Sequence, residues 1–277
     1  MNFAKMESAG NDFIIIDNRT PRLSGEQLSQ IASTLCQRRT ALGADALIVI
    51  ENPETDTDLR IKMYNADGSS LEMCSNGIRC AARYAFEHHL AGAVMRIESC
   101  GRRVQVSTTD PGSWKLQLDP PDLEEPEHTW EAENDTVTYA YLEFGGMPHA
   151  VIRHPGLTVL NVQNQRLLAI AQGLRYSERY PKGVNVSFYD SAKEGEATVI
   201  TYERGAETFT PSCGIGACAS AIVMMRKRET YANPLNVRVP MGEYRIEVEW
   251  DPESKEVKGL YLSGKTRMIA EGNTLEI

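Results

Sequence analysis

The chain has 277 residues, of which 42% are hydrophobic and 24% charged, and its formal net charge at pH 7 is −9. This balance excludes a disordered chain, and the length predicts one large domain or two of about 140 residues each. The acidic charge argues against nucleic acid as a partner, and no apolar run reaches the roughly 18 residues that a membrane span needs. We expect a cytoplasmic protein whose cysteines are free thiols.

Strand-like and helix-like segments alternate along the chain. Segments rich in Val, Ile and Tyr and bounded by turn residues predict strands at 13–17, 46–51, 59–65, 94–99, 103–107, 115–119, 137–144, 149–154, 184–190, 197–203, 236–240, 244–250 and 258–263. Helical periodicity predicts helices at 24–37, 76–90, 164–175 and 216–230. The second and fourth are apolar or small on most faces, which is typical of buried helices. This predicts the α+β class, with a curved, mostly antiparallel sheet wrapped around one central helix in each half.

The two halves of the sequence resemble each other. Three short matches follow in order, at offsets of 136, 138 and 139 residues: Gly10-Asn11-Asp12-Phe13 with Gly146-Met147-Pro148-His149, Lys62-Met63-Tyr64 with Ile200-Thr201-Tyr202, and Cys74-Ser75-Asn76-Gly77 with Cys213-Gly214-Ile215-Gly216. We interpret this as a duplicated, pseudo-symmetric domain. The predicted domains are residues 1–118 with 266–277, and residues 119–265, with the Pro/Glu-rich stretch 119–127 as a linker. The active site is expected in the cleft between the halves, where Cys74 would face Cys213.

Cys74 and Cys213 each come just before a Gly-containing turn that opens a predicted buried helix. A helix N-terminus stabilises a thiolate and also binds a carboxylate. One such cysteine is more often a small buried hydrophobe, but two at matching places favour a function. The cysteine spacings and the absence of a nearby His argue against zinc, and no nucleotide or pyridoxal-phosphate motif is present. A single-thiol mechanism with His149 would leave the second thiol unexplained.

Two opposed thiols suit racemisation or epimerisation at the α-carbon of an amino acid. One group removes the proton from one face and the other returns a proton to the opposite face. The α-proton is weakly acidic, so the carboxylate must be held by strong electrostatics, which two helix N-termini would provide.

Several motifs, taken together, resemble the cofactor-independent diaminopimelate epimerase family over essentially the whole chain. They are Gly10-Asn11-Asp12-Phe13, Tyr64-Asn65-Ala66-Asp67-Gly68, Cys74-Ser75-Asn76-Gly77-Ile78-Arg79-Cys80, Pro148-His149, Val184-Asn185, Tyr202-Glu203-Arg204-Gly205 and Cys213-Gly214-Ile215-Gly216-Ala217-Cys218. The resemblance implies a lysine-biosynthesis isomerase without cofactor or metal, with Cys74 and Cys213 as base and acid. It implies that Asn11, Asn65, Asn185, Glu203 and Arg204 line the substrate, with Glu203 near the α-amino group. The backbone at Ser75, Asn76, Gly214 and Ile215 would hold the carboxylate, and His149 would lie near the chemistry.

The sequence departs from the family pattern at several of these positions. Ala46 replaces a usual Gln, Met147 a usual Asn, Ser75 a usual Gly and Ile215 a usual Ser or Thr, and one extra residue precedes Cys213. We therefore expect a small-molecule amino-acid substrate, LL- and meso-diaminopimelate first. A racemase of another amino acid, such as histidine, and a non-catalytic amino-acid-binding module are the alternatives. A homodimer is the candidate assembly.

Overall fold

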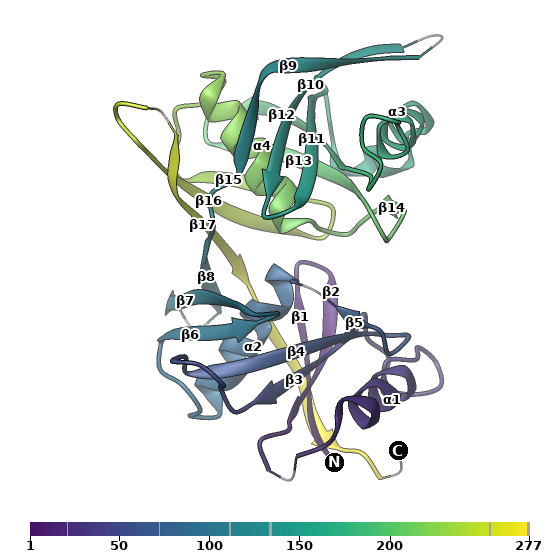
Figure 1. The fold of residues 1–277 in the computed structure, drawn as a ribbon, viewed down its shortest axis with the longest axis vertical. Helices are drawn as coiled ribbons and strands as arrows, with labels where there is room; N and C mark the ends of the chain where they lie inside the picture. The colour runs from purple at the N-terminus through teal and green to yellow at the C-terminus, as the bar shows by residue number, and fades with distance from the viewer. Residues whose placement is uncertain (21, 72, 111, 133–134, 255, 276–277) are drawn as a thin grey trace. The chain divides into compact units, whose positions relative to one another are not determined.

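The computed structural model describes residues 1–20, 22–71, 73–110, 112–132, 135–254 and 256–275 (Figure 1). The chain divides into two compact units, one formed by Met1–Gln117 with Ser263–Ile277 and the other by Leu118–Leu262. The predicted domain ranges also contain residues 21, 72, 111, 133–134, 255 and 276–277, which lie outside the described residues.

The first unit pairs its strands in the ladder β18–β1–β2–β3–β4–β6–β7–β8, which is antiparallel except at β2–β3 and β4–β6. Its helices α1 and α2 pack against these strands (Figure 1). The elements are β1 (Asn2–Ser8), β2 (Asn11–Asp17), α1 (Gly25–Leu35), β3 (Ala46–Glu51), β4 (Leu59–Asn65), β5 (Ser70–Leu71), α2 (Ser75–Glu87), β6 (Val94–Ser99), β7 (Arg102–Asp110), β8 (Ser113–Leu118) and β18 (Arg267–Asn273).

The second unit repeats this order, with the ladder β9–β10–β11–β12–β13–β15–β16 and parallel pairs at β11–β12 and β13–β15. The α+β class is confirmed, and the described residues contain four α-helices. The elements are β9 (Asp122–Ala132), β10 (Asp135–Phe144), β11 (Met147–Arg153), the 3-10 helix η1 (Val159–Gln163), α3 (Gln165–Arg175), β12 (Asn185–Lys193), β13 (Glu196–Glu203), β14 (Thr208–Phe209), α4 (Gly214–Arg226), β15 (Leu235–Val239), β16 (Gly242–Trp250) and β17 (Val257–Lys265).

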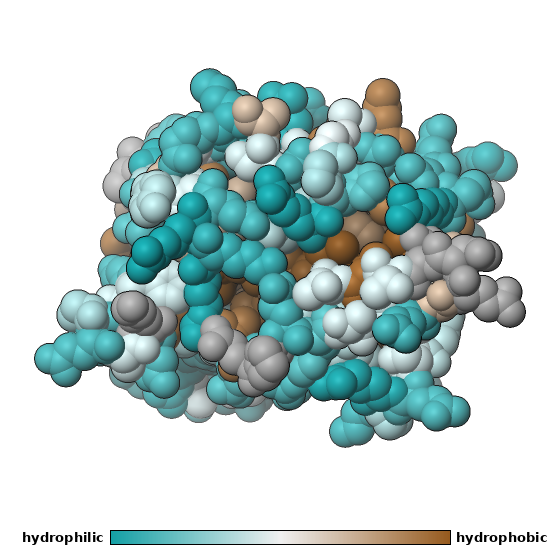
Figure 2. Space-filling view, turned by 90° about the horizontal axis from the view of Figure 1, so that it is seen from above, coloured by the Kyte–Doolittle hydropathy of each residue, from teal (hydrophilic) through white to brown (hydrophobic). Residues whose placement is uncertain are grey.

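The central strands are apolar on both faces because a helix covers each face. Ile14 and Ile16 of β2 belong to the core cluster that contains Leu28 of α1. Phe13 faces α2 instead, and its ring lies 3.5 Å from the position of a Cβ on Gly77. All six residues of β3 are buried, as expected for a strand covered on both sides. Hydrophilic side chains cover most of the face shown in Figure 2, where hydrophobic residues appear mainly in hollows.

The prediction of a linker at residues 119–127 is wrong for most of its length. Residues from Asp122 onward form β9, which pairs with β10 through contacts such as Leu123 opposite Leu142. The ladder shifts register between Glu124 and His128. Composition rich in Glu and Pro therefore marked an irregular strand and not a loop.

Candidate active site

The first cysteine lies at the start of the buried helix of the first unit. Cys74 is the N-cap residue of α2, in an extended conformation with φ −122° and ψ 110°, and is half-buried. The first turn of α2 contains Ser75 and Asn76, which are 8% and 3% exposed. The first N–H groups of a helix have no carbonyl partner within it. The backbone of this turn is therefore suited to bind a carboxylate or to stabilise a thiolate.

A chain of hydrogen bonds joins this helix start to Asn11. Asn76 Nδ2 donates to Asn11 Oδ1 at 2.6 Å, and Asn11 Nδ2 donates to Asp45 Oδ2 at 3.1 Å. The buried guanidinium of Arg79 donates to Asn76 Oδ1 and, at 3.2 Å, to the hydroxyl of Ser8. Arg79 thereby fixes which side of the Asn76 amide faces Asn11. The sequence analysis gave Arg79 no role, although a cation one turn after Asn76 in an apolar helix is a signal for such a contact.

The predicted residue Asn65 lies at the end of β4, opposite Ala46 of β3. Its Nδ2 donates to Ser69 Oγ at 2.9 Å, across the turn that follows the strand. Ala46 is 2% exposed, so the side chain at this position is small and closely packed.

The second cysteine has the same position in the second unit. Cys213 is the N-cap residue of α4, with φ −129° and ψ 107°, and its Sγ accepts a hydrogen bond from the N–H of Gly216 at 3.3 Å. Cys213 is 9% exposed, and Gly214 beside it is buried, whereas Ile215 is half-buried. Gly216 is required here, because a Cβ would lie 2.3 Å from Thr201 Oγ1. The close approach of α4 to β13 therefore depends on a glycine.

Glu203 lies beside Cys213 and changes its electrostatics. The Glu203 carboxylate, at the end of β13, is hydrogen-bonded to the Cys213 thiol and accepts a hydrogen bond from the hydroxyl of Thr210. Burial raises the pKa of Glu203, and the hydrogen bonds from Thr210 and Cys213 oppose this shift. Burial, followed by the charge of Glu203, raises the pKa of Cys213 well above its usual value. Cys213 is therefore a protonated thiol at neutral pH.

A second hydrogen-bonded group in this unit contains Asn185, His149 and Arg204. Asn185 Nδ2 contacts His149 Nε2 at 3.3 Å, and Asn185 Oδ1 accepts from the N–H of Arg204 at 2.8 Å. The Arg204 guanidinium donates to the carbonyl of Lys182 at 3.2 Å. His149 is fully buried, and burial, with a smaller effect from Arg204, lowers its pKa to about 3. His149 is therefore neutral, with Nε2 as the acceptor for Asn185.

The described structure places the predicted residues in three local groups. Asn11 and Asn76 meet at the start of α2, Glu203 meets Cys213 at the start of α4, and Asn185 joins His149 to Arg204. Asn65 and Met147 lie at strand ends, and Met147 begins β11 opposite Phe144. Thr210 was missed in the sequence analysis, since nothing in its sequence context marks a turn residue as a partner of Glu203.

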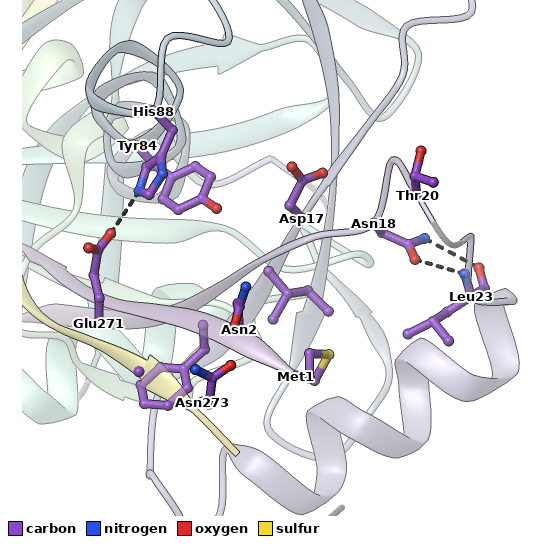
Figure 3. Close-up of a pocket in the computed structure, with 13 residues that line it drawn as sticks. Met1, Asn2, Asp17, Asn18, Thr20, Leu23, Tyr84, His88, Glu271 and Asn273 are labelled. Atoms are coloured by element: carbon purple, nitrogen blue, oxygen red, sulfur yellow. Dashed lines mark hydrogen bonds and ion pairs between the residues drawn. The ribbon is translucent and has the colours of Figure 1, made fainter. Parts of the chain in front are cut away.

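A large pocket of about 850 Å³ lies elsewhere in the first unit (Figure 3). It is lined by the chain start, the loop after β2 and the end of α2, where the rings of Tyr84 and His88 stack at 4.1 Å. His88 Nε2 contacts Glu271 Oε1 at 2.7 Å. None of the predicted site residues lines this pocket.

Two features of the described residues concern other classes of function. No cluster of three or more His, Cys, Asp or Glu side chains arranged to hold a metal ion occurs within the described ranges. The part of the chain that the structure describes also contains no helix that is long and apolar enough to cross a membrane.

The fold places this chain in a class of two-unit α+β proteins. A crystal structure of a probable proline racemase from Agrobacterium radiobacter K84 has the same fold, with a TM-score of 0.74 at 14% identity, covering 99% of this chain and 93% of that one. The chain belongs to the diaminopimelate epimerase family, whose model, described as diaminopimelate epimerase, matches residues 3–123 and 144–269.

Individual relatives agree with this assignment. Diaminopimelate epimerase of Aquifex aeolicus is 34% identical over 285 aligned residues, covering 100% of this chain and 98% of that protein. Diaminopimelate epimerase of Halorhodospira halophila is 31% identical and covers 98% and 94% of the two chains. The family resemblance predicted from the sequence motifs is thus confirmed.

Proposed function

We propose that this protein is a pyridoxal-phosphate-independent epimerase that interconverts LL- and meso-diaminopimelate by inverting one α-carbon. The observation that carries the proposal is the pair of cysteines at equivalent helix starts: Cys74 caps α2 and Cys213 caps α4, in two units with the same order of elements. Family membership supplies the substrate class.

In the proposed reaction, one cysteine thiolate takes the α-proton while the other thiol gives a proton to the opposite face. One C–H and one S–H bond break as one S–H and one C–H bond form, so the substrate is inverted and the thiols exchange protonation states. The raised pKa of Cys213 favours the protonated thiol, which supports it as the proton donor for one direction. The proposal requires both helix starts to reach the same α-carbon.

The remaining site residues would bind and orient the substrate. Backbone N–H groups at Ser75, Asn76, Gly214 and Ile215 would hold the α-carboxylate, where negative charge develops as the proton leaves. Glu203 would bind the α-ammonium, because it is the carboxylate next to Cys213. Arg204 would pair with the distal carboxylate by a charge-assisted hydrogen bond.

The three remaining amide side chains and His149 would help to bind and position the substrate. Asn11, Asn65 and Asn185 would offer hydrogen bonds to the two polar ends of the substrate. His149 acts through Asn185, since it is neutral and its Nε2 is occupied by the Asn185 amide. We also propose a cytoplasmic place in lysine biosynthesis and a homodimeric assembly, with neither nucleic acid nor membrane as a partner. These proposals rest on family membership and on the acidic composition.

Deuterium uptake at the α-carbon in heavy water tests the proposal directly. With the purified protein and no added cofactor, both diaminopimelate isomers should incorporate solvent deuterium at one α-position, measured by mass spectrometry or proton NMR. Histidine and other single-centre amino acids serve as competing substrates. If one of these amino acids exchanges and diaminopimelate does not, the protein is a racemase of another amino acid. If diaminopimelate binds without exchange, the protein is a non-catalytic binding module.

A further inference from the structure

The segment between Glu203 and Cys213 is held in place at two points. Thr210 N–H donates to the carbonyl of Thr201 at 3.1 Å, which fixes this residue to β13, and Met241 N–H donates to the carbonyl of Pro211 at 3.0 Å. Held in this way, the half-buried Thr210 directs its hydroxyl to Glu203 Oε1. The backbone thus places one hydrogen-bond donor on the carboxylate beside Cys213.

We propose that Thr210 is a positioning residue that keeps the Glu203 carboxylate ionised and oriented for the α-ammonium of the substrate. This inference rests on the proposed function and deepens it. A carboxylate binds an ammonium well only when it is charged, and a buried carboxylate without hydrogen-bond donors takes up a proton instead. Burial raises the pKa of Glu203, so the donated hydrogen bond opposes protonation.

The other donor to Glu203 cannot serve the same purpose throughout the reaction. The Cys213 thiol also bonds to Glu203, but in the proposed cycle this thiol loses its proton to the substrate. When Cys213 becomes a thiolate, it no longer donates and adds a negative charge beside Glu203. The Thr210 hydroxyl has no comparable acidity and remains a donor in both states. Thr210 is therefore the permanent partner of Glu203.

Within the described residues, few other ionisable groups affect the charge state of Glu203. Cys213, at the start of α4, is the titratable group that interacts with it, and Cys218 of the same helix acts on Cys213. Arg204 follows Glu203 in the chain, but its guanidinium donates to the carbonyl of Lys182. A change at Thr210 should therefore be detected mainly through the charge of Glu203.

Equilibrium binding in a Cys74→Ala background separates recognition from turnover. Binding of meso-diaminopimelate to this protein, measured by calorimetry from about pH 5 to about pH 8, reports whether Glu203 is ionised. Adding Thr210→Val should weaken binding by about tenfold at the acid end, because a hydrogen bond to a charged group is lost. The loss should shrink as pH rises and the carboxylate ionises. Thr210→Ser, which keeps the hydroxyl, should restore binding to within about twofold.

Two controls make the outcome specific. Thr208→Val is the matched substitution, because Thr208 is exposed and its hydroxyl makes no hydrogen bond among the described residues, and it should leave the binding curve unchanged. In a Glu203→Gln background, Thr210→Val should have little further effect, since there is no charge left to stabilise.

Several results would overturn the inference about Thr210. These are a Thr210→Val curve that coincides with the parent, a loss that is equal at every pH, or a full additional loss in the Glu203→Gln background. Failure of the proposed function is a different result. In that case the unmodified protein neither exchanges deuterium into diaminopimelate nor binds it.

Discussion

At the scale of single residues, the two cysteines carry the clearest prediction. Each face of the α-carbon needs its own proton carrier, so Cys74→Ala and Cys213→Ala should each lower epimerisation by at least about a thousandfold. Serine is a far weaker acid than cysteine, so the Ser variants should recover little activity. Epimerisation is measured by the interconversion of LL and meso isomers on a chiral column. Wild-type activity in either Ala variant would exclude the two-base mechanism.

Cys218→Ala is the matched control for this pair, because it removes a buried thiol from the interior of α4 without changing the helix start. It should leave the turnover rate within about twofold of the wild type. A loss as large as that of Cys213→Ala would show that α4 tolerates no cysteine change, and the Cys213→Ala result would then not identify a proton carrier.

His149 predicts how stability depends on pH. Its folded-state pKa is lowered to about 3 by burial and by Arg204, from an ordinary value of 6.5. The unfolded chain therefore binds a proton more readily, so His149 favours folding above its ordinary pKa, and this contribution is lost as pH falls. The loss amounts to about 1.4 kcal/mol for each pH unit between these two values.

Chemical denaturation at several pH values measures this effect. In His149→Gln, the free energy of unfolding should fall less steeply between about pH 6 and about pH 4 than in the wild type. Glu203, whose folded pKa is raised, acts in the opposite direction in both proteins and cancels from the comparison. His89→Gln, a change at an exposed histidine, is the control for the loss of an imidazole. Equal slopes in wild type and His149→Gln would contradict the buried, neutral state of His149.

At the scale of secondary-structure elements, the start of α4 depends on Gly216. A Cβ on Gly216 would lie 2.3 Å from Thr201 Oγ1 and 2.7 Å from Ser187 Oγ, closer than real contacts allow. Gly216→Ala should therefore destabilise the protein by about 1–3 kcal/mol and displace the Cys213 end of α4. Adding Thr201→Ala and Ser187→Ala removes both hydroxyls and should restore part of the melting temperature.

Gly92→Ala is the corresponding control, because the nearest atom to a Cβ there is 3.8 Å away. It should leave the melting temperature unchanged to within about one or two degrees. A Gly216→Ala protein with the wild-type melting temperature and full activity would show that α4 does not need its close approach to β13.

The sequence predicted elements best where apolar residues are continuous or alternate along a strand. The strands β3, β4 and β6 have the predicted bounds, because their continuous or alternating apolar residues reflect burial directly. β1, β9 and β18 were missed. Their exposed polar positions resemble loops, and their backbone pairing with strands distant in sequence decides their structure. The buried helices α2 and α4 were predicted, but α2 ends three residues and α4 four residues before the predicted end. Hydrophobic periodicity defines the middle of a helix better than its ends.

Only part of the candidate site was predictable from the sequence. The two N-cap cysteines were found from the sequence, because a duplicated motif marks them. Thr210 was not, because it contacts Glu203 only through the fold of the turn between β13 and α4. Arg79 was also missed, although its place one turn after Asn76 in an apolar helix indicates such a contact.

At the scale of the whole molecule, the two units share one topology but differ in charge at equivalent places. Asn65 ends β4 and Glu203 ends β13, so the neutral amide of one unit corresponds to the carboxylate of the other. Cys74 and Cys213 occupy the same N-cap position, and at Cys213 the side chain also accepts a hydrogen bond from the N–H of Gly216 and is hydrogen-bonded to the Glu203 carboxylate. In the proposed epimerase, this asymmetry distinguishes the ammonium side of the substrate from the other side.

Met147 affects how tightly the proposed site would hold its substrate. It begins β11 at a position where the family resemblance implies Asn, so the proposed site would have one hydrogen-bond donor fewer. A lost bond to a charged group costs about 1.5–3 kcal/mol, or roughly ten- to a hundredfold in affinity. We therefore expect turnover of diaminopimelate with weak apparent binding.

Met147→Asn should lower KM for diaminopimelate by about tenfold or more and leave kcat nearly unchanged, because the new bond holds the distal end in the ground and transition states alike. Met147→Leu, which adds no donor, is the matched control and should change KM by less than about threefold. Uncharged smaller amino acids should be poor substrates for each protein, since they lack the remote group whose binding assists the reacting centre. If the KM of Met147→Asn is unchanged, or if its activity shifts toward histidine, then Met147 lies away from the distal carboxylate. In that case the protein is better assigned as a racemase of another amino acid, with both thiols retained in the mechanism.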